Sequence, residues 1–265
     1  MTQAEPRPQD GWVDLAQGRI FVRSWEPALP PTLSPVVLFH DSLGCVALWR
    51  DFPERLCRAT GRRVIAYDRL GFGLSDARTD RLSLEFIAQE AVAVLPDLQR
   101  SLAFERFVAL GHSVGGGMAV HAAAQWSRHC DALITAAAQT FPEGRTLSAI
   151  AAAREFFSDP AQFQRLERYH GAKAGWVLDA WTESWLSPAF ATWSLAPVLP
   201  RVRCPALVLH GSEDEYGSAC HPLLIGDLSG GQARVEILPG VGHVPHRDHP
   251  EQTVALITEF LAALP

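Results

Sequence analysis

The stretch Gly111-His112-Ser113-Val114-Gly115 decides how this chain folds. It follows an apolar run over 107–110 that is typical of a buried strand, and it opens a run of small residues over 115–126 that is typical of a closely packed helix. A serine flanked by glycines at this spacing predicts a sharp strand–turn–helix elbow, because a larger side chain there would collide with neighbouring backbone. The elbow exposes the hydroxyl at a helix N-terminus, where partial positive charge favours a developing anion. We therefore predict that Ser113 is a nucleophile.

Further apolar runs bounded by turn residues predict the rest of a sheet. Because these runs are continuous rather than alternating, they indicate strands covered on both faces, which is typical of a parallel sheet with crossover helices. The predicted strands cover residues 36–39, 63–67, 107–110, 132–138, 206–210 and 234–238, after an early hairpin over 13–25 that turns near Gln17 and Gly18. The predicted fold class is α/β, with a mostly parallel sheet flanked by helices.

The segments between these strands predict helices. One covers residues 84–102 with Ser83 at its cap position, and Pro96 inside it predicts a kink or two shorter helices. Another closes the chain over 250–264 with an amphipathic pattern.

Residues 141–196 break the alternation of strands and helices. They show helical periodicity without a clear strand, and four of the chain's eight tryptophans fall within 176–193. We interpret 141–196 as a small helical cap inserted into one domain that covers residues 1–265.

Composition excludes several classes of protein. The 265 residues are 48% hydrophobic and 20% charged, which is ordinary for a globular protein. The net charge of −6 disfavours a nucleic-acid partner, and no apolar run approaches the ~18 residues of a membrane helix. The polar, proline-rich start lacks the apolar stretch of a secretory signal, so the expected location is cytoplasmic. The oligomeric state stays open.

The five cysteines are odd in number and include no C-x-x-C pair, which favours neither a disulfide framework nor a zinc ribbon. We interpret them as scattered thiols in a reducing compartment. They are Cys45, Cys57, Cys130, Cys204 and Cys220.

A serine nucleophile needs a base and an orienting acid, which in this arrangement follow it in the order acid, then histidine. Asp214 follows the strand over 206–210, and His243 follows the strand over 234–238. Both therefore lie at carboxyl ends of strands, the edge where Ser113 lies and where open α/β sheets bind ligands. Glu213 and Glu215 flank Asp214 and stay alternative acids.

Three histidines occur close together in His243-Val-Pro-His-Arg-Asp-His249. Such spacing can form a metal site, which His210 or His221 could complete. We prefer the interpretation of a surface loop that contains histidines, and we expect no metal. His112, inside the elbow, is expected only to pack or cap there.

The chain resembles the α/β-hydrolase superfamily over nearly its whole length. The resemblance rests on five motifs in order: His40-Asp-Ser-Leu-Gly, Asp68-Arg-Leu-Gly-Phe-Gly-Leu-Ser75, Gly111-His-Ser-Val-Gly-Gly, His210-Gly-Ser-Glu-Asp-Glu and Gly240-Val-Gly-His. It implies an α/β-hydrolase sheet and a triad of Ser113, Asp214 and His243. It also implies an oxyanion hole made by the backbone N–H groups of Val114 and Ser42.

The expected activity is hydrolysis of an ester, lactone or similar acyl bond through an acyl-enzyme, without metal or organic cofactor. The serine argues against dehalogenase and epoxide-hydrolase chemistry, which use an aspartate at the elbow in this superfamily. Carbon–carbon bond hydrolysis of a diketone uses the same triad and stays an alternative. A ligand receptor on the hydrolase scaffold also stays open, and a cofactor-free dioxygenase is a more distant alternative.

One residue departs from the family pattern. Members usually carry His-Gly at the oxyanion loop, whereas this chain has His40-Asp41. Aspartate tolerates positive φ better than most replacements, but its charge would oppose an oxyanion. We expect Asp41 to be paired, with Arg69 as the candidate partner, or turned outward.

The cap tryptophans predict the substrate. Trp181 and Trp185 lie four residues apart and share a helix face, whereas Trp176 is displaced from them. We expect Trp181 and Trp185 to bind a small-molecule apolar acyl substrate with an aromatic or medium-length chain, with simple core packing as the alternative. No arginine cluster accompanies them, so an anionic substrate is disfavoured.

Overall fold

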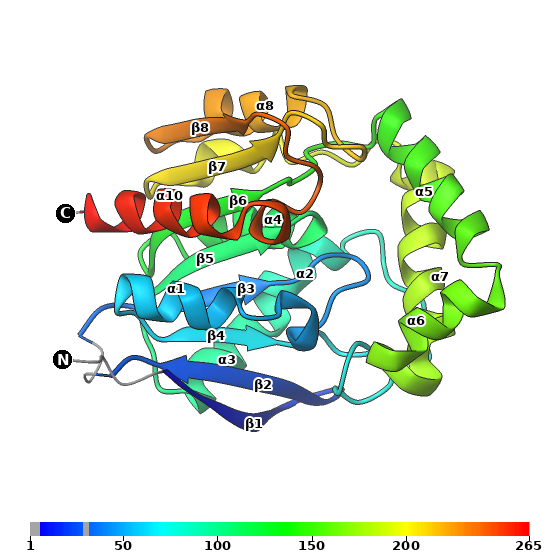
Figure 1. The fold of residues 1–265 in the computed structure, drawn as a ribbon, viewed down its shortest axis with the longest axis horizontal. Helices are drawn as coiled ribbons and strands as arrows, with labels where there is room; N and C mark the ends of the chain where they lie inside the picture. The colour runs from blue at the N-terminus through cyan, green and yellow to red at the C-terminus, as the bar shows by residue number, and fades with distance from the viewer. Residues whose placement is uncertain (1–5, 29–31, 265) are drawn as a thin grey trace.

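Eight strands form one sheet in the computed structural model, which describes residues 6–28 and 32–264. Their order across the sheet is β1-β2-β4-β3-β5-β6-β7-β8 (Figure 1). The strands are β1 (Arg7–Leu15), β2 (Gly18–Glu26), β3 (Val36–Phe39), β4 (Val64–Tyr67), β5 (Phe107–His112), β6 (Cys130–Ala136), β7 (Ala206–Gly211) and β8 (Ala233–Leu238).

The pairing confirms the predicted fold class. Strands β3 to β8 pair in parallel, and only β2 pairs antiparallel with β1 and β4 within the described chain. Every residue of β3, β4, β5 and β7 is buried, as the continuous apolar runs predicted. The hairpin begins earlier than predicted because most side chains of β1 are exposed and so carry no apolar signal. Strand β6 ends earlier than predicted, since Ala137 has a φ of 52° and leaves the extended conformation.

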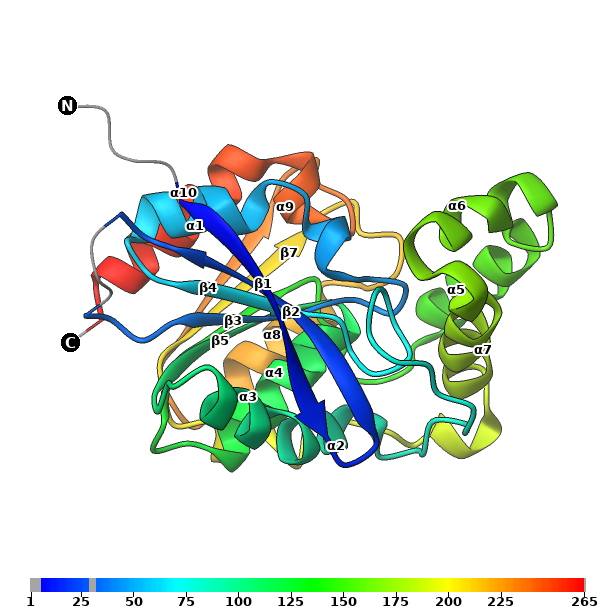
Figure 2. The same ribbon diagram turned by 90° about the horizontal axis from the view of Figure 1, so that it is seen from below.

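Helices cover both faces of the sheet (Figure 2). One face carries α1 (Phe52–Thr60) and α10 (Pro250–Ala262), which bury Leu56 and Ile257. The other face carries α2 (Phe86–Ala93), α3 (Leu95–Ser101), α4 (Val114–Gln125) and α8 (Cys220–Leu228). Short α9 (Pro245–Asp248) precedes α10. The break between α2 and α3 falls just before Pro96, so the prediction of two shorter helices is confirmed.

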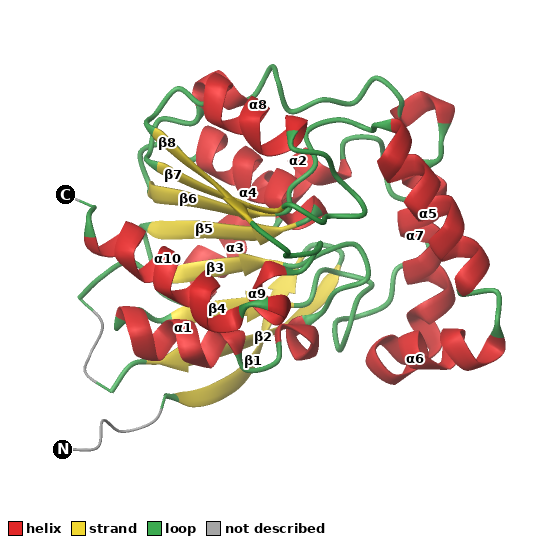
Figure 3. Ribbon diagram, turned by 45° about the horizontal axis from the view of Figure 1, so that its top comes forward, coloured by secondary structure: helices red, strands yellow, loops and turns green. Residues whose placement is uncertain are grey.

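Three further helices stand apart from both layers, beyond the carboxyl ends of the central strands (Figure 3). They are α5 (Gly144–Phe156), α6 (Pro160–His170) and α7 (Ala174–Trp185), and we call them the cap. Across the residues that the structure describes, no helix is both long and apolar enough to span a bilayer.

Candidate active site

Ser113 lies at the turn between β5 and α4 with φ 55° and ψ −125°, a backbone conformation that few residues other than glycine adopt. The two glycines of the motif make the turn possible. A Cβ at Gly111 would lie 2.0 Å from the carbonyl oxygen of Gly115, and a Cβ at Gly115 would lie 2.1 Å from that of Phe39. The close approach of β5, the start of α4 and the end of β3 therefore requires glycine at both positions, as the elbow predicted from the sequence implies.

Ser113 heads a chain of hydrogen bonds across the carboxyl edge of the sheet. Its Oγ lies 3.0 Å from His243 Nε2, and His243 Nδ1 lies 2.9 Å from both carboxylate oxygens of Asp214. A carboxylate only accepts, so Nδ1 carries the proton and Nε2 accepts the Ser113 hydroxyl. This is the arrangement in which a serine can be deprotonated as it attacks.

Asp214 is held as a carboxylate. Besides His243, it accepts hydrogen bonds from the backbone N–H groups of Tyr216 and Gly217, at 2.8 and 3.0 Å. Burial raises the pKa of the Asp214 carboxyl, but the hydrogen bond and charge of His243 outweigh it, so the pKa lies below its usual range. The two alternative acids do not contact the His243 ring nitrogen that Asp214 holds. Glu213 is exposed, and Glu215 accepts a hydrogen bond from the backbone N–H of His243 at 3.3 Å.

His112 does more than the sequence indicated. Its Nε2 donates to the carbonyl oxygen of His243 at 2.8 Å, so the elbow itself holds the backbone of the base. Burial lowers the pKa of His112 to about 4, so the ring is neutral at neutral pH. The contact joins residues 131 positions apart, and no local pattern reveals it.

The predicted oxyanion donors are available. Neither the Ser42 N–H nor the Val114 N–H donates a hydrogen bond within the described residues. The preceding carbonyl of Asp41 is anchored by three donors: His40 Nδ1 at 2.8 Å, Arg69 Nη2 at 2.9 Å and the Gly44 N–H at 3.2 Å. In a planar trans peptide, C=O and N–H point in opposite directions, so these contacts fix the direction of the Ser42 N–H.

The Asp41 side chain corrects two expectations. Arg69 binds the backbone carbonyl of Asp41 rather than its carboxylate, and Asp41 is not among the described non-glycine residues with positive φ. The carboxylate instead lies over Gly44, where Oδ1 would be 1.9 Å from an added Cβ, and Oδ2 lies 3.8 Å from His112 Nδ1. Glycine at position 44 therefore provides the space for the aspartate at position 41.

A cavity of about 260 Å³ opens onto Ser113. It lies between the oxyanion loop, the loops after β7 and β8, and the cap. Its lining is Asp41, Ser42, Leu43, Ser113, Gln139, Thr146, Ile150, Trp181, Trp185, Glu215, Tyr216, His243 and Val244. The structure thus brings Ser42, Trp181 and Trp185 to the same space as Ser113 and His243. Trp176 lies elsewhere: its ring contacts Phe72 and its Nε1 donates to Asp80 O.

Gln139 is a site residue that the sequence analysis missed. Its carboxamide lies 3.3 Å from Ser113 Oγ, and its side chain is buried. The signal was its place just after a predicted strand, at the carboxyl edge where Asp214 and His243 were found.

The histidine-rich loop does not gather ligands. His249 is exposed, but His246 is buried against the rings of Trp49 and Phe52, so a surface loop was the wrong interpretation for His246. Over residues 6–28 and 32–264, no three His, Cys, Asp or Glu side chains come together as a metal site would require.

Comparison with known proteins agrees with this fold. The family model described as "Alpha/beta hydrolase family" matches residues 36–256. This chain belongs to that family. This hydrolase is 26% identical to 2-hydroxymuconate semialdehyde hydrolase of a Pseudomonas species (strain CF600) over 86% of its own length and 87% of that protein. It is 28% identical to a non-heme chloroperoxidase of Streptomyces lividans, over 77% and 82%.

Other similarities cover less sequence or show the fold alone. The hydrolase is 30% identical to human 1-acylglycerol-3-phosphate O-acyltransferase ABHD5 over 42% of its own length, and the match spans only 31% of that protein. Among solved structures, a proline iminopeptidase of Mycobacterium smegmatis superposes with a TM-score of 0.75 at 21% identity, covering 96% of this chain and 98% of that one.

Proposed function

We propose that this hydrolase cleaves a small, uncharged ester or lactone through an acyl-enzyme on Ser113. One observation carries the proposal. A continuous hydrogen-bond chain runs from Asp214 through His243 to Ser113, and Ser113 lines a cavity. Two free backbone N–H groups, at Ser42 and Val114, support acyl chemistry, because they suit the oxyanion that forms when a carbonyl is attacked.

In the first half of the proposed reaction, Ser113 Oγ attacks the substrate carbonyl carbon and its proton passes to His243 Nε2. The Asp214 carboxylate stabilises the imidazolium that results. The carbonyl oxygen becomes an oxyanion and accepts from the Ser42 and Val114 N–H groups. When the intermediate collapses, His243 gives the proton to the leaving alcohol and the acyl group stays on Ser113.

In the second half, water replaces the alcohol. His243 Nε2 takes a proton from the water as it attacks the acyl carbon, and the oxyanion forms again at the same two N–H groups. Collapse breaks the bond to Ser113 Oγ, which regains its proton from His243 and releases the acid.

The chemistry of the cavity supports a small, neutral acyl group. Its volume of about 260 Å³ is just below the range of ~300–1,000 Å³ for drug-sized ligands. Trp181 and Trp185 supply apolar surface, whereas Asp41 and Glu215 place two carboxylates in the lining. None of the described residues that line it is an arginine or a lysine, so an anionic substrate would find no counter-charge.

Carbon–carbon bond hydrolysis of a diketone is a second candidate. The similarity to a 2-hydroxymuconate semialdehyde hydrolase favours it, and the same three residues would serve. A muconate-type substrate carries a carboxylate, however, and the acidic lining of this cavity opposes one. We therefore place the ester or lactone first.

Replacing Ser113 by alanine tests the proposal directly. We expect kcat to fall by ~10³-fold or more because the nucleophile is lost. The melting temperature should change little, since only one hydroxyl is removed. Hydrolysis of p-nitrophenyl esters of graded acyl length is the assay, and an activated phosphonate should label the wild type but not Ser113→Ala.

The outcomes separate the alternatives. A phosphonate-labelled serine with turnover of diketones and none of esters or lactones would favour the carbon–carbon hydrolase. If the phosphonate does not label Ser113 and the protein hydrolyses no ester, lactone or diketone, a ligand receptor is favoured. An alanine variant with most of the wild-type activity would remove Ser113 from the mechanism.

The two tryptophans predict selectivity. Replacing Trp181 or Trp185 by alanine should change kcat/KM for short esters relative to long ones, because each ring borders the acyl cavity. Trp176→Ala is the matched control, since that ring contacts Phe72 and lies outside the lining. Unchanged relative kcat/KM in both variants would show that the two rings are only core.

A further inference from the structure

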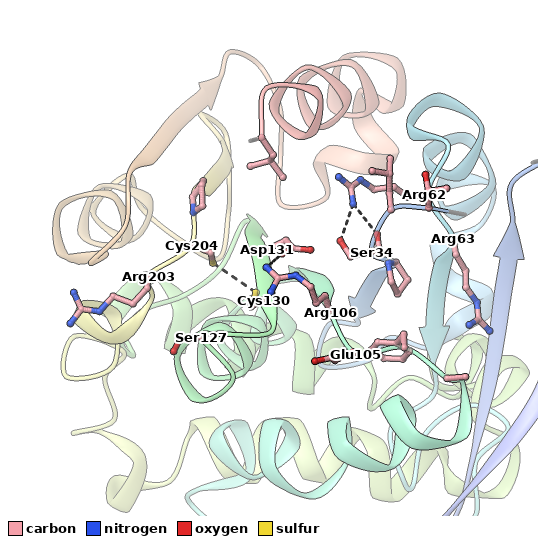
Figure 4. Close-up of a pocket in the computed structure, with 17 residues that line it drawn as sticks. Ser34, Arg62, Arg63, Glu105, Arg106, Ser127, Cys130, Asp131, Arg203 and Cys204 are labelled. Carbon is pink, nitrogen blue, oxygen red and sulfur yellow. Dashed lines mark hydrogen bonds and ion pairs between the residues drawn. The ribbon is translucent and has the colours of Figure 1, made fainter. Parts of the chain in front are cut away.

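A second cavity, of about 800 Å³, lies at the opposite edge of the sheet, where the parallel strands begin (Figure 4). Its lining includes Cys130, the first residue of β6, and Cys204, which lies two residues before β7. The sequence analysis interpreted all five cysteines as scattered thiols, because they are odd in number and form no C-x-x-C pair, and these two are 74 positions apart. The fold places them side by side.

The two sulfur atoms are close enough to join after small side-chain rotations. They lie 3.8 Å apart and share a hydrogen bond. Strands β6 and β7 are neighbours, with Leu133 opposite Ala206, so both cysteines lie at the beginnings of adjacent strands. Adjacent strands are ~4.8 Å apart, and disulfides need Cα atoms ~4.4–6.8 Å apart. Continued back from Leu133 and Ala206, the register places Cys204 opposite Asp131, one residue along from Cys130, and a diagonal step of that size keeps the Cα atoms roughly 6 Å apart, within this range.

The surroundings favour Cys204 as the sulfur that reacts first, whereas burial raises the pKa of its partner Cys130 well above its usual range. Burial raises the pKa of Cys45 and of Cys57 to about 12, so those thiols stay protonated. At Cys204, the hydrogen bond with the Cys130 thiol lowers the pKa and outweighs burial. The Arg106 guanidinium, paired with Asp131, lies beside the pair in the cavity wall (Figure 4). Thiolates rather than thiols are the nucleophiles in sulfur oxidation.

We propose that Cys130 and Cys204 are an oxidisable dithiol, which hydrogen peroxide converts into an intramolecular disulfide. The sulfur of Cys204 attacks one peroxide oxygen, the O–O bond breaks, and a sulfenic acid and one water form. The sulfur of Cys130 then attacks the sulfenic sulfur, the S–O bond breaks, and the hydroxide leaves with the thiol proton as a second water. Two thiols lose two electrons, and peroxide is reduced to two waters.

The position of this bond gives it a structural effect. It would close a loop that contains the whole cap, because α5, α6 and α7 all lie between Cys130 and Cys204. A cross-link over so long a loop restricts the unfolded chain and stabilises the native state. We expect oxidation to raise Tm by about 5–10 °C.

Peptide mapping tests the proposal without any activity assay, so it stands or falls separately from the ester hydrolysis. The full chain is treated with hydrogen peroxide, the free thiols are alkylated, and the digest is analysed by mass spectrometry. We expect one cross-linked peptide pair, Cys130 with Cys204, that a dithiol reductant reverses. Cys220→Ser is the matched control, because Cys220 is exposed and outside the pair, and it should leave the cross-link and the Tm shift intact.

The variants Cys130→Ser and Cys204→Ser should each abolish the cross-link and the rise in Tm. Wild-type mapping decides the question even if a serine variant folds poorly. The proposal is overturned if peroxide leaves both thiols free, or if it yields sulfinic or sulfonic acid at Cys204 without the cross-link.

Discussion

At the scale of single residues, the oxyanion loop shows how a departure from a family pattern is accommodated. Asp41 stands where the resemblance to the α/β-hydrolase superfamily predicts glycine, and its carboxylate lies in the space left by the missing side chain of Gly44. Its carbonyl keeps three donors, so the Ser42 N–H keeps its direction. The backbone geometry of the loop therefore does not depend on glycine at position 41.

Arg69 positions the oxyanion loop through the Asp41 carbonyl, and this role predicts a kinetic signature. Arg69→Met removes the Nη2 donor to Asp41 O but keeps most of the apolar stem. We expect kcat to fall ~10–100-fold with little change in KM, because an oxyanion donor acts on the transition state rather than on bound substrate. Steady-state kinetics on a p-nitrophenyl ester measures both values.

Arg78→Met is the control for loss of one arginine near the same loop. Its guanidinium pairs with Asp80 and lies over the Trp176 ring, and within the described residues it makes no hydrogen bond or ion pair with the oxyanion loop, so kcat should stay near the wild-type value. A rise in KM alone in Arg69→Met, or unchanged kinetics in a folded variant, would contradict the positioning role.

At the scale of elements, the cap is tied to the body of the molecule at the junction of α6 and α7. Lys173 donates to the carbonyl oxygens of Gly73, at 2.7 Å, and of Phe72, at 3.3 Å, and also to that of Ser75. His170 bridges two loops, accepting from the Gly73 N–H at 2.9 Å and donating to Leu43 O at 3.0 Å. The cap thus contacts the segment that follows the oxyanion donor Ser42.

Removing the ammonium should loosen this junction. Lys173→Met keeps an unbranched apolar stem but removes the ammonium from three carbonyls, of which the Phe72 carbonyl still accepts from the Ser75 N–H. We expect Tm to fall by about 2–6 °C, consistent with a loss of ~1–3 kcal/mol, and chymotrypsin to cleave within the cap faster. Differential scanning calorimetry and timed digestion measure these effects.

Arg154→Met serves as the matched control, since it removes one positive charge from the exposed surface of α5. Equal effects in the two variants would show that lost charge, rather than the lost junction, is responsible.

The elements also show what sequence could predict. Buried parallel strands are continuous apolar runs, and the residues just after β5, β7 and β8 are marked by glycines, so the strands and the trio of Ser113, Asp214 and His243 could be found. Contacts between distant segments leave no such pattern. The His112 bond to His243, the Lys173 junction and the Cys130–Cys204 pair all depend on how strands and loops meet in three dimensions. The burial of His246 was missed for the same reason.

At the scale of the whole molecule, buried neutral histidines set the response to acid. Burial lowers the pKa of His112 and of His170 to about 4, whereas an unfolded histidine titrates near ~6.5. Between these values the unfolded chain binds more protons, so stability is full above pH ~6.5 and falls as the pH drops toward 4. At pH 5 each histidine lowers the free energy of unfolding by about 2 kcal/mol.

Thermal melts at pH 7.5, 6 and 5 measure this loss, and Tm should fall at each step. His170→Gln should make the fall shallower because one of the groups is gone. His249→Gln, at an exposed histidine, is the control and should leave the slope unchanged. A Tm that stays constant from pH 7.5 to 5 would contradict the role of the buried rings.

Lys173 is the only lysine among the 265 residues. The ammonium of Lys173 is therefore the one side-chain amine that an acylating reagent can modify. It donates hydrogen bonds to three carbonyl oxygens. An acylating dye must meet the amine when it is deprotonated and away from those oxygens. The rate of dye incorporation at this position consequently reports how often the junction between cap and body opens, with no engineered label.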